Sequence, residues 1–521
     1  MTEPFTEKEI LKAIKSLKNN KAAGIDDLQP ELFKNSPVKL AEHIANLLNN
    51  IASTGTFPED IQDAILTPLQ KPGKKRGPIK HLRPLMLTTC LRKIMAICLI
   101  DRTYDSLTKY IPKSQAAYQS GRSTTEQVFA VKLLTEKAIS RMDSEIHLLF
   151  LDMSAAFDCV DRNLLLADLE KVVGKDILFL ISTLVNNTSV RIRVNGHLSD
   201  KFISNVGVAQ GDCLSAILFI FYLACSITIN NIQDVNSSKA LHHHDYTMPS
   251  NTEQSDSTSN TGIDSQYADD LTWINTVKEE LNRIKEWITT QLKARNLTIN
   301  DTKTEEFTID RDVNNNEWKK CKFLGTLIDS ESDIHRRKTL ANTAYAKCKH
   351  IFTNRNLSTN TKIRVFNVYV SSVFLYNSEL WTTTNKIEDD IDIFQRKLLR
   401  RILSIYYPNI ISNEDLYRKT NQQPWSERIF YRRLSWIGHL LRLDPTTPAR
   451  KALSYYLQPA KRPVGGQKLT WIDIANGNLD ELNIPLDIEK PETYPIVLPR
   501  KDWKNRIRIN RSAIPNTVIQ H

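Results

Sequence analysis

Two acidic clusters stand out in the 521-residue sequence because each adjoins a run of apolar residues. Asp152 closes the segment HLLFLD, and Asp269 and Asp270 lie together in QYADDLTWI. Adjacent carboxylates repel one another unless cations neutralise them, and hard oxygen ligands of this kind suit Mg²⁺ or Mn²⁺. Two such ions about 4 Å apart activate an attacking hydroxyl and stabilise a leaving oxygen, which points to nucleotidyl transfer. An aspartate after a strand is more often a cap or turn residue, so these acids need further support.

Strands are expected to position these acids. Residues 147–152 predict a near-continuous apolar strand that ends in Asp152. Apolar residues at alternate positions after Asp270 predict a strand pair with Asp269 and Asp270 at its tight turn. Residues 66–87 predict a strand, a basic Pro/Gly loop and a second strand.

Helices are expected on either side of these strands. Helical spacing of apolar residues predicts helices over residues 6–18, with Thr6 as the cap, and over 123–142. From residue 333 onward the pattern is helical with little strand signal. Residues 231–265 are poor in apolar side chains, which predicts a flexible surface insertion, and the three adjacent histidines 242–244 inside it receive no function.

Composition indicates a globular protein with a polyanionic partner. Hydrophobic residues make up 41% and charged residues 25%, which disfavours wholesale disorder, a collagen-like repeat and an integral membrane protein. Lys plus Arg exceed Asp plus Glu by 70 − 59 = 11. Such an excess favours nucleic acid or an acidic surface as the partner. The longest apolar run, residues 217–229, falls short of the ~20 residues that cross a bilayer, so no membrane partner is expected.

Cysteine usage and the first residues predict an intracellular protein. The seven cysteines are dispersed and odd in number, which indicates neither a disulfide framework nor a zinc ribbon. The first thirty residues mix acids and lysines without an apolar core, so a secretory signal is not expected.

Four motifs occur in the order found in reverse transcriptases: LFLDMSAAFDCVDR, GVAQGDCLSAILF, QYADDLTW and KFLGTLI. The chain most closely resembles the polymerase of non-long-terminal-repeat, or LINE-like, retrotransposons. KSLKNNKAAGIDDLQPELFK lies upstream, and RRLSWIGHLLRLD and GGQKLTWID lie downstream, and all three resemble flanking segments of those elements. The resemblance covers about residues 5–475.

This resemblance implies roles for individual residues. Asp152, Asp269 and Asp270 would be the catalytic carboxylates and the metal ligands for two Mg²⁺ ions, or Mn²⁺, with Asp152 and Asp269 as direct ligands and Asp270 in support. Phe157 matches the aromatic gate that fills the space of a ribose 2′-hydroxyl. The other substrate-binding positions are Lys71, Arg83, Gln210, Gly211 and Lys303.

Within that set, the implied roles differ. Arg83 would meet the triphosphate, with Lys71 as a second candidate. Gln210 and Gly211 would lie under the nucleotide and template, and Lys303 would protonate the departing pyrophosphate. The primer grip would be the turn formed by Phe323, Leu324 and Gly325.

Downstream basic residues are interleaved with aromatic residues, a pattern that suits backbone contact and base stacking. The rings are Trp425, Tyr431 and Trp436. The predicted nucleic-acid-binding residues are Arg396, Lys397, Arg400, Arg401, Arg432 and Arg433, with Arg428 on the same basic face. An ordinary charged helix surface is the alternative.

The expected fold is α+β, a right-hand polymerase with fingers and palm over residues 1–330, a helical thumb over 331–420 and a basic helical C-terminal extension over 421–521. The expected activity is RNA-directed DNA synthesis, with an RNA template, a DNA primer and deoxynucleoside triphosphates as partners. The resemblance implies a ribonucleoprotein of nucleus and cytoplasm, and the oligomeric state stays open.

Two alternatives remain open at this stage. One is a catalytically silent, domesticated RNA-binding protein, favoured by Ala209 and Ala216 where relatives often have Pro or Arg and Pro, respectively. The other is a different templated polymerase of the same architecture, such as an intron-encoded maturase. Because no endonuclease-like segment precedes residue 5 and no Cys/His knuckle follows residue 475, autonomous insertion into DNA is not expected.

Overall fold

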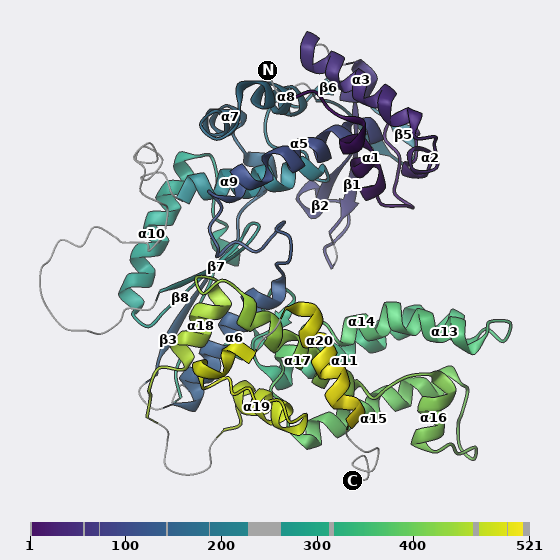
Figure 1. Cartoon of the computed structure of the whole chain (residues 1–521), viewed down its shortest axis with the longest axis vertical. Helices are drawn as coiled ribbons and strands as arrows, with labels where there is room; N and C mark the ends of the chain where they lie inside the picture. Colours follow the sequence, from purple (N-terminus) through teal and green to yellow (C-terminus); the bar gives the residue numbers. More distant parts are fainter. Residues whose placement is uncertain are drawn as a thin grey trace, which may run out of the picture.

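The computed structural model describes residues 3–513 apart from 56–57, 72, 142–143, 187, 228–261, 312–316, 462–467 and 497–498. An upper and a lower lobe lie on either side of a small central sheet (Figure 1). Most of the predicted insertion at 231–265, including the three histidines, falls outside the described residues. Its last residues are not part of an insertion, because strand β7 begins at Ile263.

The upper lobe combines helices with a mixed sheet. Strand β1 pairs antiparallel with β2 and parallel with β4, which also pairs with β5 and β6. The strand–loop–strand prediction for residues 66–87 is confirmed by the β1–β2 pair. The strands are β1 (Ala64–Gln70), β2 (Leu82–Leu87), β4 (Ser189–Val194), β5 (His197–Leu198) and β6 (Phe202–Ile203). The helices are α1 (Glu7–Ser16), α2 (Pro30–Lys34), α3 (Lys39–Thr54), α4 (Glu59–Gln62), η1 (Ile79–His81), α5 (Cys90–Thr108), η2 (Ala156–Cys159), α7 (Arg162–Glu170), α8 (Lys175–Asn186) and α9 (Cys213–Ile227).

The central sheet has the order β7-β8-β3-β9, and all its neighbours are antiparallel. Its strands are β3 (Ile146–Leu151), β7 (Ile263–Tyr267), β8 (Asp270–Asn275) and β9 (Glu305–Ile309). Leu149 and Leu151 pack into the core of the upper lobe, whereas Ile146 and Leu148 pack into that of the lower lobe. Because both faces are covered, β3 is apolar at nearly every position.

The lower lobe is almost entirely helical, as expected from residue 333 onward. Helix α6 (Thr124–Ser140), predicted over 123–142, crosses to this lobe and packs against α18 (Figure 1). The long helix α10 (Lys278–Ala294) lies beside the central sheet. The remaining elements are η4 (Asp301–Lys303), η5 (Glu317–Lys320), β10 (Lys322–Phe323), β11 (Thr326–Leu327), α11 (Ser330–Lys347), α12 (Lys349–Thr353), α13 (Thr359–Phe366), η6 (Asn367–Ser371), α14 (Ser372–Phe374), η7 (Ser378–Leu380), α15 (Asn385–Ile402), α16 (Asn413–Thr420), α17 (Trp425–Arg442), α18 (Pro448–Tyr456), α19 (Trp471–Glu481), η8 (Pro491–Ile496) and α20 (Arg500–Ala513).

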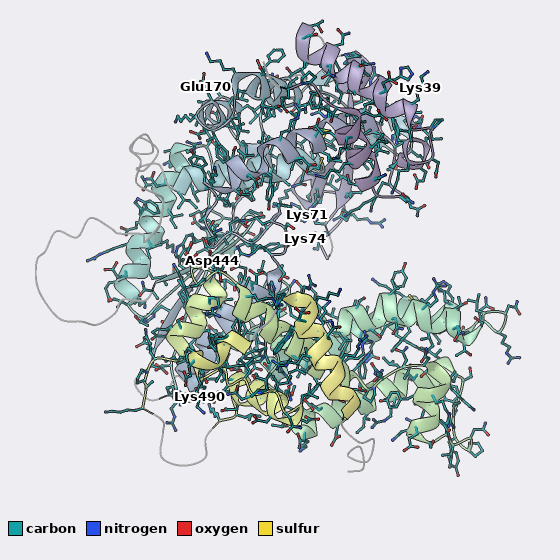
Figure 2. The ribbon with its side chains drawn as sticks, viewed as in Figure 1. Lys39, Lys71, Lys74, Glu170, Asp444 and Lys490 are labelled. Carbon is teal, nitrogen blue, oxygen red and sulfur yellow. The ribbon has the colours of Figure 1, made fainter. Side chains whose placement is uncertain are left out.

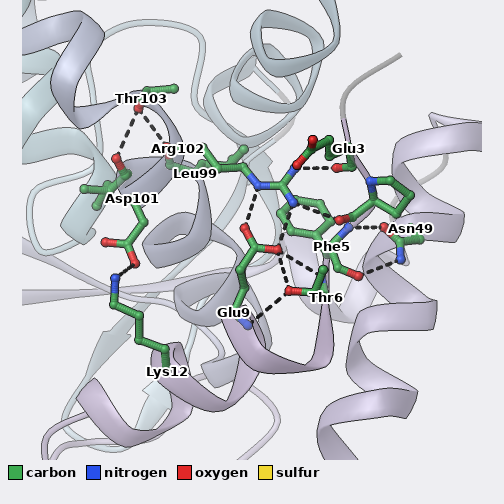
Figure 3. Close-up of polar contacts among 12 residues, drawn as sticks. Glu3, Phe5, Thr6, Glu9, Lys12, Asn49, Leu99, Asp101, Arg102 and Thr103 are labelled. Carbon is green, nitrogen blue, oxygen red and sulfur yellow. Dashed lines mark hydrogen bonds and ion pairs between the residues drawn. The ribbon is translucent and has the colours of Figure 1, made fainter.

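The N-terminal helix α1 is fixed to α5 by a polar network (Figure 3). Thr6 caps α1 and forms a capping box with Glu9, as the sequence predicts for the cap. Arg102 of α5 donates to both carboxylate oxygens of Glu9, at 2.9 and 3.0 Å, and its guanidinium lies 4.3 Å from the ring centre of Phe5. Lys12 pairs with Asp101 at 2.7 Å.

The mixed helix and sheet architecture confirms the α+β prediction. Helices α17 to α20 share one hydrophobic core with α6 and the lower face of the central sheet. Trp425 and Ile429, at the start of α17, pack instead into the core formed by α11 to α16. The domain boundaries at 330 and 420 stay a prediction. Among the described residues, no helix is long and apolar enough to span a bilayer.

Candidate active site

The fold brings the three predicted carboxylates together at one end of the central sheet. Asp152 follows β3 directly, and the β3–β8 pairing places Leu151 opposite Leu271, the residue after Asp270. Asp269 lies in the turn between β7 and β8. Two segments that are more than 100 residues apart in the chain therefore supply acids to one place, and the predicted strand pair with its acidic turn is confirmed.

The three acids act on one another electrostatically. Burial raises the pKa of Asp269, and the charge of Asp152 raises it further, whereas Lys303 and Arg83 oppose the rise. Burial raises the pKa of Asp270 to about 6, with further contributions from Asp269 and Asp152. The site therefore concentrates negative charge and favours the binding of cations.

A glutamine that the sequence reasoning missed holds the acidic turn. Gln115 Oε1 accepts a hydrogen bond from Ala268 N at 2.9 Å, and its Nε2 donates to Ala268 O at 3.3 Å. Ala268 has φ +55°, in the left-handed region that non-glycine residues rarely adopt. Ala116 N donates to Gln266 O, and Gln266 N donates to Ser114 O, each at 3.0 Å. The segment before α6 thus runs along β7 and fixes the turn, although no local pattern in the sequence marks it.

Lys303 lies directly against the first aspartate. Its Nζ donates to Asp152 Oδ2 at 2.6 Å. Backbone hydrogen bonds hold the two segments together: Asn300 N donates to Asp152 O at 2.8 Å, and Ser154 N to Thr298 O at 2.9 Å. The structure therefore places this predicted substrate-binding lysine at the site.

Phe157 lies in a stack of aromatic rings near the acids. Its ring stacks on that of Phe219, with the centres 4.3 Å apart and 21° between the ring planes, and Tyr118 meets it edge-on at 6.4 Å. Burial raises the pKa of Tyr118, and the charge of Asp269 contributes while Arg83 opposes it. Tyr118, a second residue that the sequence reasoning missed, therefore contacts the predicted gate and lies within reach of the charge of Asp269.

Gln210 and Gly211 lie against strand β2, which carries Arg83. Gln210 O accepts from Met86 N at 2.8 Å. Gly211 has φ +113°, and a Cβ atom there would stand 2.8 Å from Met86 O. The close approach that this glycine permits is to the β2 backbone, and its contact with a nucleotide stays a prediction.

Lys71 starts the basic loop between β1 and β2. Its Nζ donates to Lys80 O at 3.0 Å, and its backbone N donates to His81 O at 2.9 Å, so the side chain braces its own loop. Figure 2 shows Lys71 and Lys74 where this loop extends towards the lower lobe. The positive charge of Lys71 opposes the burial that raises the pKa of Asp158, the neighbour of the predicted gate.

The predicted primer-grip residues lie at the turn between β10 and β11, and residues of the lower lobe hydrogen-bond to this turn. Phe323 is buried, and Leu324 has φ +44°. The Tyr376 hydroxyl donates to Leu324 O at 3.0 Å, and Arg336 Nη1 donates to Gly325 O at 3.1 Å. Tyr376 is a third residue that the sequence reasoning missed, because its partner lies 52 positions away.

Two of the predicted nucleic-acid-binding arginines bind side chains of the protein itself. Arg433 is 0% exposed and donates to Asn478 Oδ1 at 2.6 Å. Its assignment to nucleic acid is wrong, because a buried guanidinium cannot meet a phosphate. Arg432 is half-buried and pairs with Glu379 at 2.6 Å.

The other four predicted nucleic-acid-binding residues lie on α15, whereas the aromatic rings expected beside them lie on α17. Lys397 is exposed, whereas Arg396, Arg400 and Arg401 are half-buried. Trp425 and Trp436 are core residues, so their predicted stacking on bases is wrong. Tyr431 and Arg428 are half-buried.

The acids fit hard divalent cations by their chemistry. All three offer carboxylate oxygens, and burial together with mutual repulsion raises the pKa of Asp269 and of Asp270. Within the part of the chain that the structure describes, no three His, Cys, Asp or Glu side chains are gathered closely enough to hold a metal ion already. Lys303 instead occupies one oxygen of Asp152.

Comparisons with known proteins identify a matching family and several similar proteins. Residues 70–328 match the family described as reverse transcriptase (RNA-dependent DNA polymerase). The probable RNA-directed DNA polymerase from transposon BS of Drosophila melanogaster is 24% identical over 480 residues, which cover 87% of this chain and 50% of that protein. The RNA-directed DNA polymerase from mobile element jockey of the same organism is 22% identical over 416 residues, which cover 76% and 44%. The chain thus spans about half the length of the curated relatives it matches.

Among solved structures, apo telomerase from Candida tropicalis is similar at 12% identity, with 88% of this chain and 74% of that chain covered and a TM-score of 0.41.

Proposed function

Because the chain belongs to the reverse transcriptase family, in the form carried by non-long-terminal-repeat transposons, we propose that it copies an RNA template into DNA by adding deoxynucleotides to a primer 3′ end. The observation that supports this activity is the convergence of Asp152, Asp269 and Asp270 from two segments of the central sheet. The fold class is that of the family, a right-hand polymerase with a C-terminal helical extension.

In this proposal the three aspartates hold divalent cations, and we propose two Mg²⁺ ions, with Mn²⁺ as a substitute. Such ions supply charge neutralisation at the attacking and leaving oxygens. Burial and the negative charge of the neighbouring aspartates raise the pKa of Asp269 and of Asp270, and bound cations would relieve this repulsion, which supports the assignment.

The chain's own residues position the reactants. Arg83 projects from β2 on the side of Asp269 and binds the triphosphate. Lys303 carries a proton on Nζ beside Asp152 and passes it to the departing pyrophosphate. Phe157, fixed by its stack on Phe219, occupies the space of a 2′-hydroxyl.

The test is extension of a DNA primer on an RNA template by the purified chain with Mg²⁺. We expect Asp269→Asn to lower the rate by at least about 100-fold, because the site loses one of the negative charges that would hold a cation. Asp200→Asn, at an exposed loop position of the upper lobe, is the matched control and should extend normally.

Normal extension by Asp269→Asn contradicts the proposed site. If the unaltered chain binds primed template but incorporates nothing on RNA or DNA, it is the silent RNA-binding protein instead. Preferred copying of DNA would favour another templated polymerase.

A further inference from the structure

Two segments of the lower lobe contain basic residues and no acidic residue. Residues 334–378 carry eight Lys and Arg, and residues 393–413 carry four. The basic residues are Arg336, Arg337, Lys338, Lys347, Lys349, Arg355, Lys362, Arg364, Arg396, Lys397, Arg400 and Arg401. Arg336 and Arg337 pair with Asp333, and Lys338 pairs with Asp390, so acids outside the two segments neutralise part of this charge. The other basic residues create a positive potential that attracts a polyanion.

These two segments meet at one end of the lobe. Tyr345, near the end of α11, stacks on Phe352 of α12 with ring centres 4.8 Å apart. Burial raises the pKa of the Tyr345 phenol, Tyr406 adds to the rise and Arg401 opposes it, so the loop after α15 lies beside the end of α11. Figure 1 shows the α13–α14 arm and the α15–α16 arm extending on the same side of the lobe, away from β3, β7 and β8.

The loop between α15 and α16 presents large side chains to solvent. Tyr407 is 94% exposed, Ile410 90% and Tyr406 61%. Arg400 and Arg401, in the last turn of α15, directly precede this loop. We call Arg400, Arg401, Tyr406, Tyr407 and Ile410 the arm-tip surface.

The chemistry of the arm-tip surface selects one kind of partner. Exposed rings next to cations fit a nucleic acid strand, since bases stack on the rings while phosphates meet the arginines. A duplex hides the faces of its bases, whereas an unpaired strand offers them. The segment that forms this surface, residues 393–413, carries four Lys and Arg and no acid, and this net positive charge favours a polyanion as the partner.

We propose that the arm-tip surface binds an unpaired segment of RNA outside the primer–template duplex. The inference rests on the proposed function for the identity of the strand as RNA. Because the α15–α16 arm extends away from the central sheet, RNA bound at its loop is additional to the part being copied (Figure 1). Such a contact would keep the chain on its template during synthesis.

The test measures binding of a fluorescein-labelled 20-nucleotide oligouridine by anisotropy, without nucleotides. We expect the double variant Tyr406→Ala and Tyr407→Ala to bind about tenfold more weakly, since stacking contributes ~1–3 kcal/mol per base and 1.4 kcal/mol is tenfold. Binding of a blunt 20-base-pair RNA duplex should be unchanged. The double variant Tyr406→Phe and Tyr407→Phe keeps both rings and should bind oligouridine normally.

Two controls separate this proposal from simpler explanations. Lys39→Ala removes an exposed cation from the upper lobe and should leave the affinity unchanged, which excludes a general charge effect. Asp269→Asn should bind oligouridine normally, so a chain that fails to polymerise can still pass this test. Unfolding temperatures should agree among the Tyr406, Tyr407 and Lys39 variants, because the side chains replaced in them are exposed.

Oligouridine binding that is unchanged in the alanine variant would overturn the proposal and leave the arm-tip surface to a protein partner. Equal loss in the phenylalanine variant would also overturn it, because stacking would not explain the effect. Equally weakened binding of the RNA duplex in the alanine variant would overturn it as well, because the contact would then be with the nucleic-acid backbone alone.

Discussion

Around the three candidate aspartates, apolar packing holds side chains that have no polar atoms for hydrogen bonds. Phe157 has no polar atom in its side chain, yet its stack on Phe219 and the edge of Tyr118 hold its ring in place. A rigid ring discriminates against an added hydroxyl by volume, which is worth ~1–3 kcal/mol in an apolar pocket.

Replacing the ring should therefore weaken sugar discrimination. We expect Phe157→Ala to raise the use of ribonucleotides relative to deoxynucleotides about 10- to 100-fold. Single-nucleotide incorporation with each sugar measures the ratio. Phe202→Ala, at a ring on strand β6 that is 43% exposed, is the control. An unchanged ratio in Phe157→Ala would remove the gate role.

The placement of individual residues was predictable from the sequence only where a motif contains them, and their roles stay predictions. Asp152 and Asp269 stand in short, ordered motifs, so their placement followed from local spacing. Gln115 acts on a turn 153 residues further along the chain, and nothing beside it signals that contact. Arg433 was misassigned because a sequence shows the charge of a residue and not its burial.

Among the elements, helix α1 depends on a charged pair that acid should break. The Arg102 guanidinium, with the hydrogen bonds from Thr6, lowers the pKa of Glu9 to about 2 against the opposing effect of burial. A lowered pKa means that the ionised form stabilises the fold. This stabilisation is fully present above about pH 4.5 and is lost as the pH falls towards 2.

Hydrogen exchange of the α1 amides between pH 3 and 7 tests this dependence. We expect Arg102→Met to lower the free energy of local opening at pH 7 by ~1–2 kcal/mol, a value reduced for the partial exposure of Glu9, and to flatten the loss on acidification. Lys12→Met breaks the exposed pair with Asp101 and should have little effect. An acid response that persists unchanged in Arg102→Met would contradict the assignment.

Elements were more predictable than the packing between them. The strand before Asp152 and the cap at Thr6 follow from patterns within a few residues. The start of β7 at Ile263 was missed, because the polar composition of the preceding segment extended the predicted insertion by a few residues. That α6 packs against α18, more than 300 positions later, follows only from the folded chain.

Across the whole molecule, Glu136 joins three distant parts of the chain. This half-buried residue of α6 accepts a hydrogen bond from the Thr382 hydroxyl and another, at 2.8 Å, from Trp471 N at the start of α19. Burial raises the pKa of Glu136, and both hydrogen bonds oppose that rise. The C-terminal helices are therefore tied to α6 by polar contacts as well as by their shared core.

Removing this carboxylate should loosen the lower lobe. We expect Glu136→Ala to lower the free energy of unfolding by ~1–3 kcal/mol, because two donors lose their acceptor. The unfolding temperature and hydrogen exchange of α19 measure the effect. Glu170→Ala, at an exposed position of α7, is the matched control. Unaltered exchange in α19 would show that apolar packing alone holds the C-terminal helices.

The segment Ser114–Ala116 lies along strand β7, an edge strand of the central sheet. Unpaired edge strands can pair with strands of other molecules and so promote aggregation. Here the same segment that fixes the acidic turn also covers this edge strand, which makes the addition of a strand from another molecule difficult on this side of the sheet. A mutation that loosens Gln115 would therefore threaten solubility as well as activity.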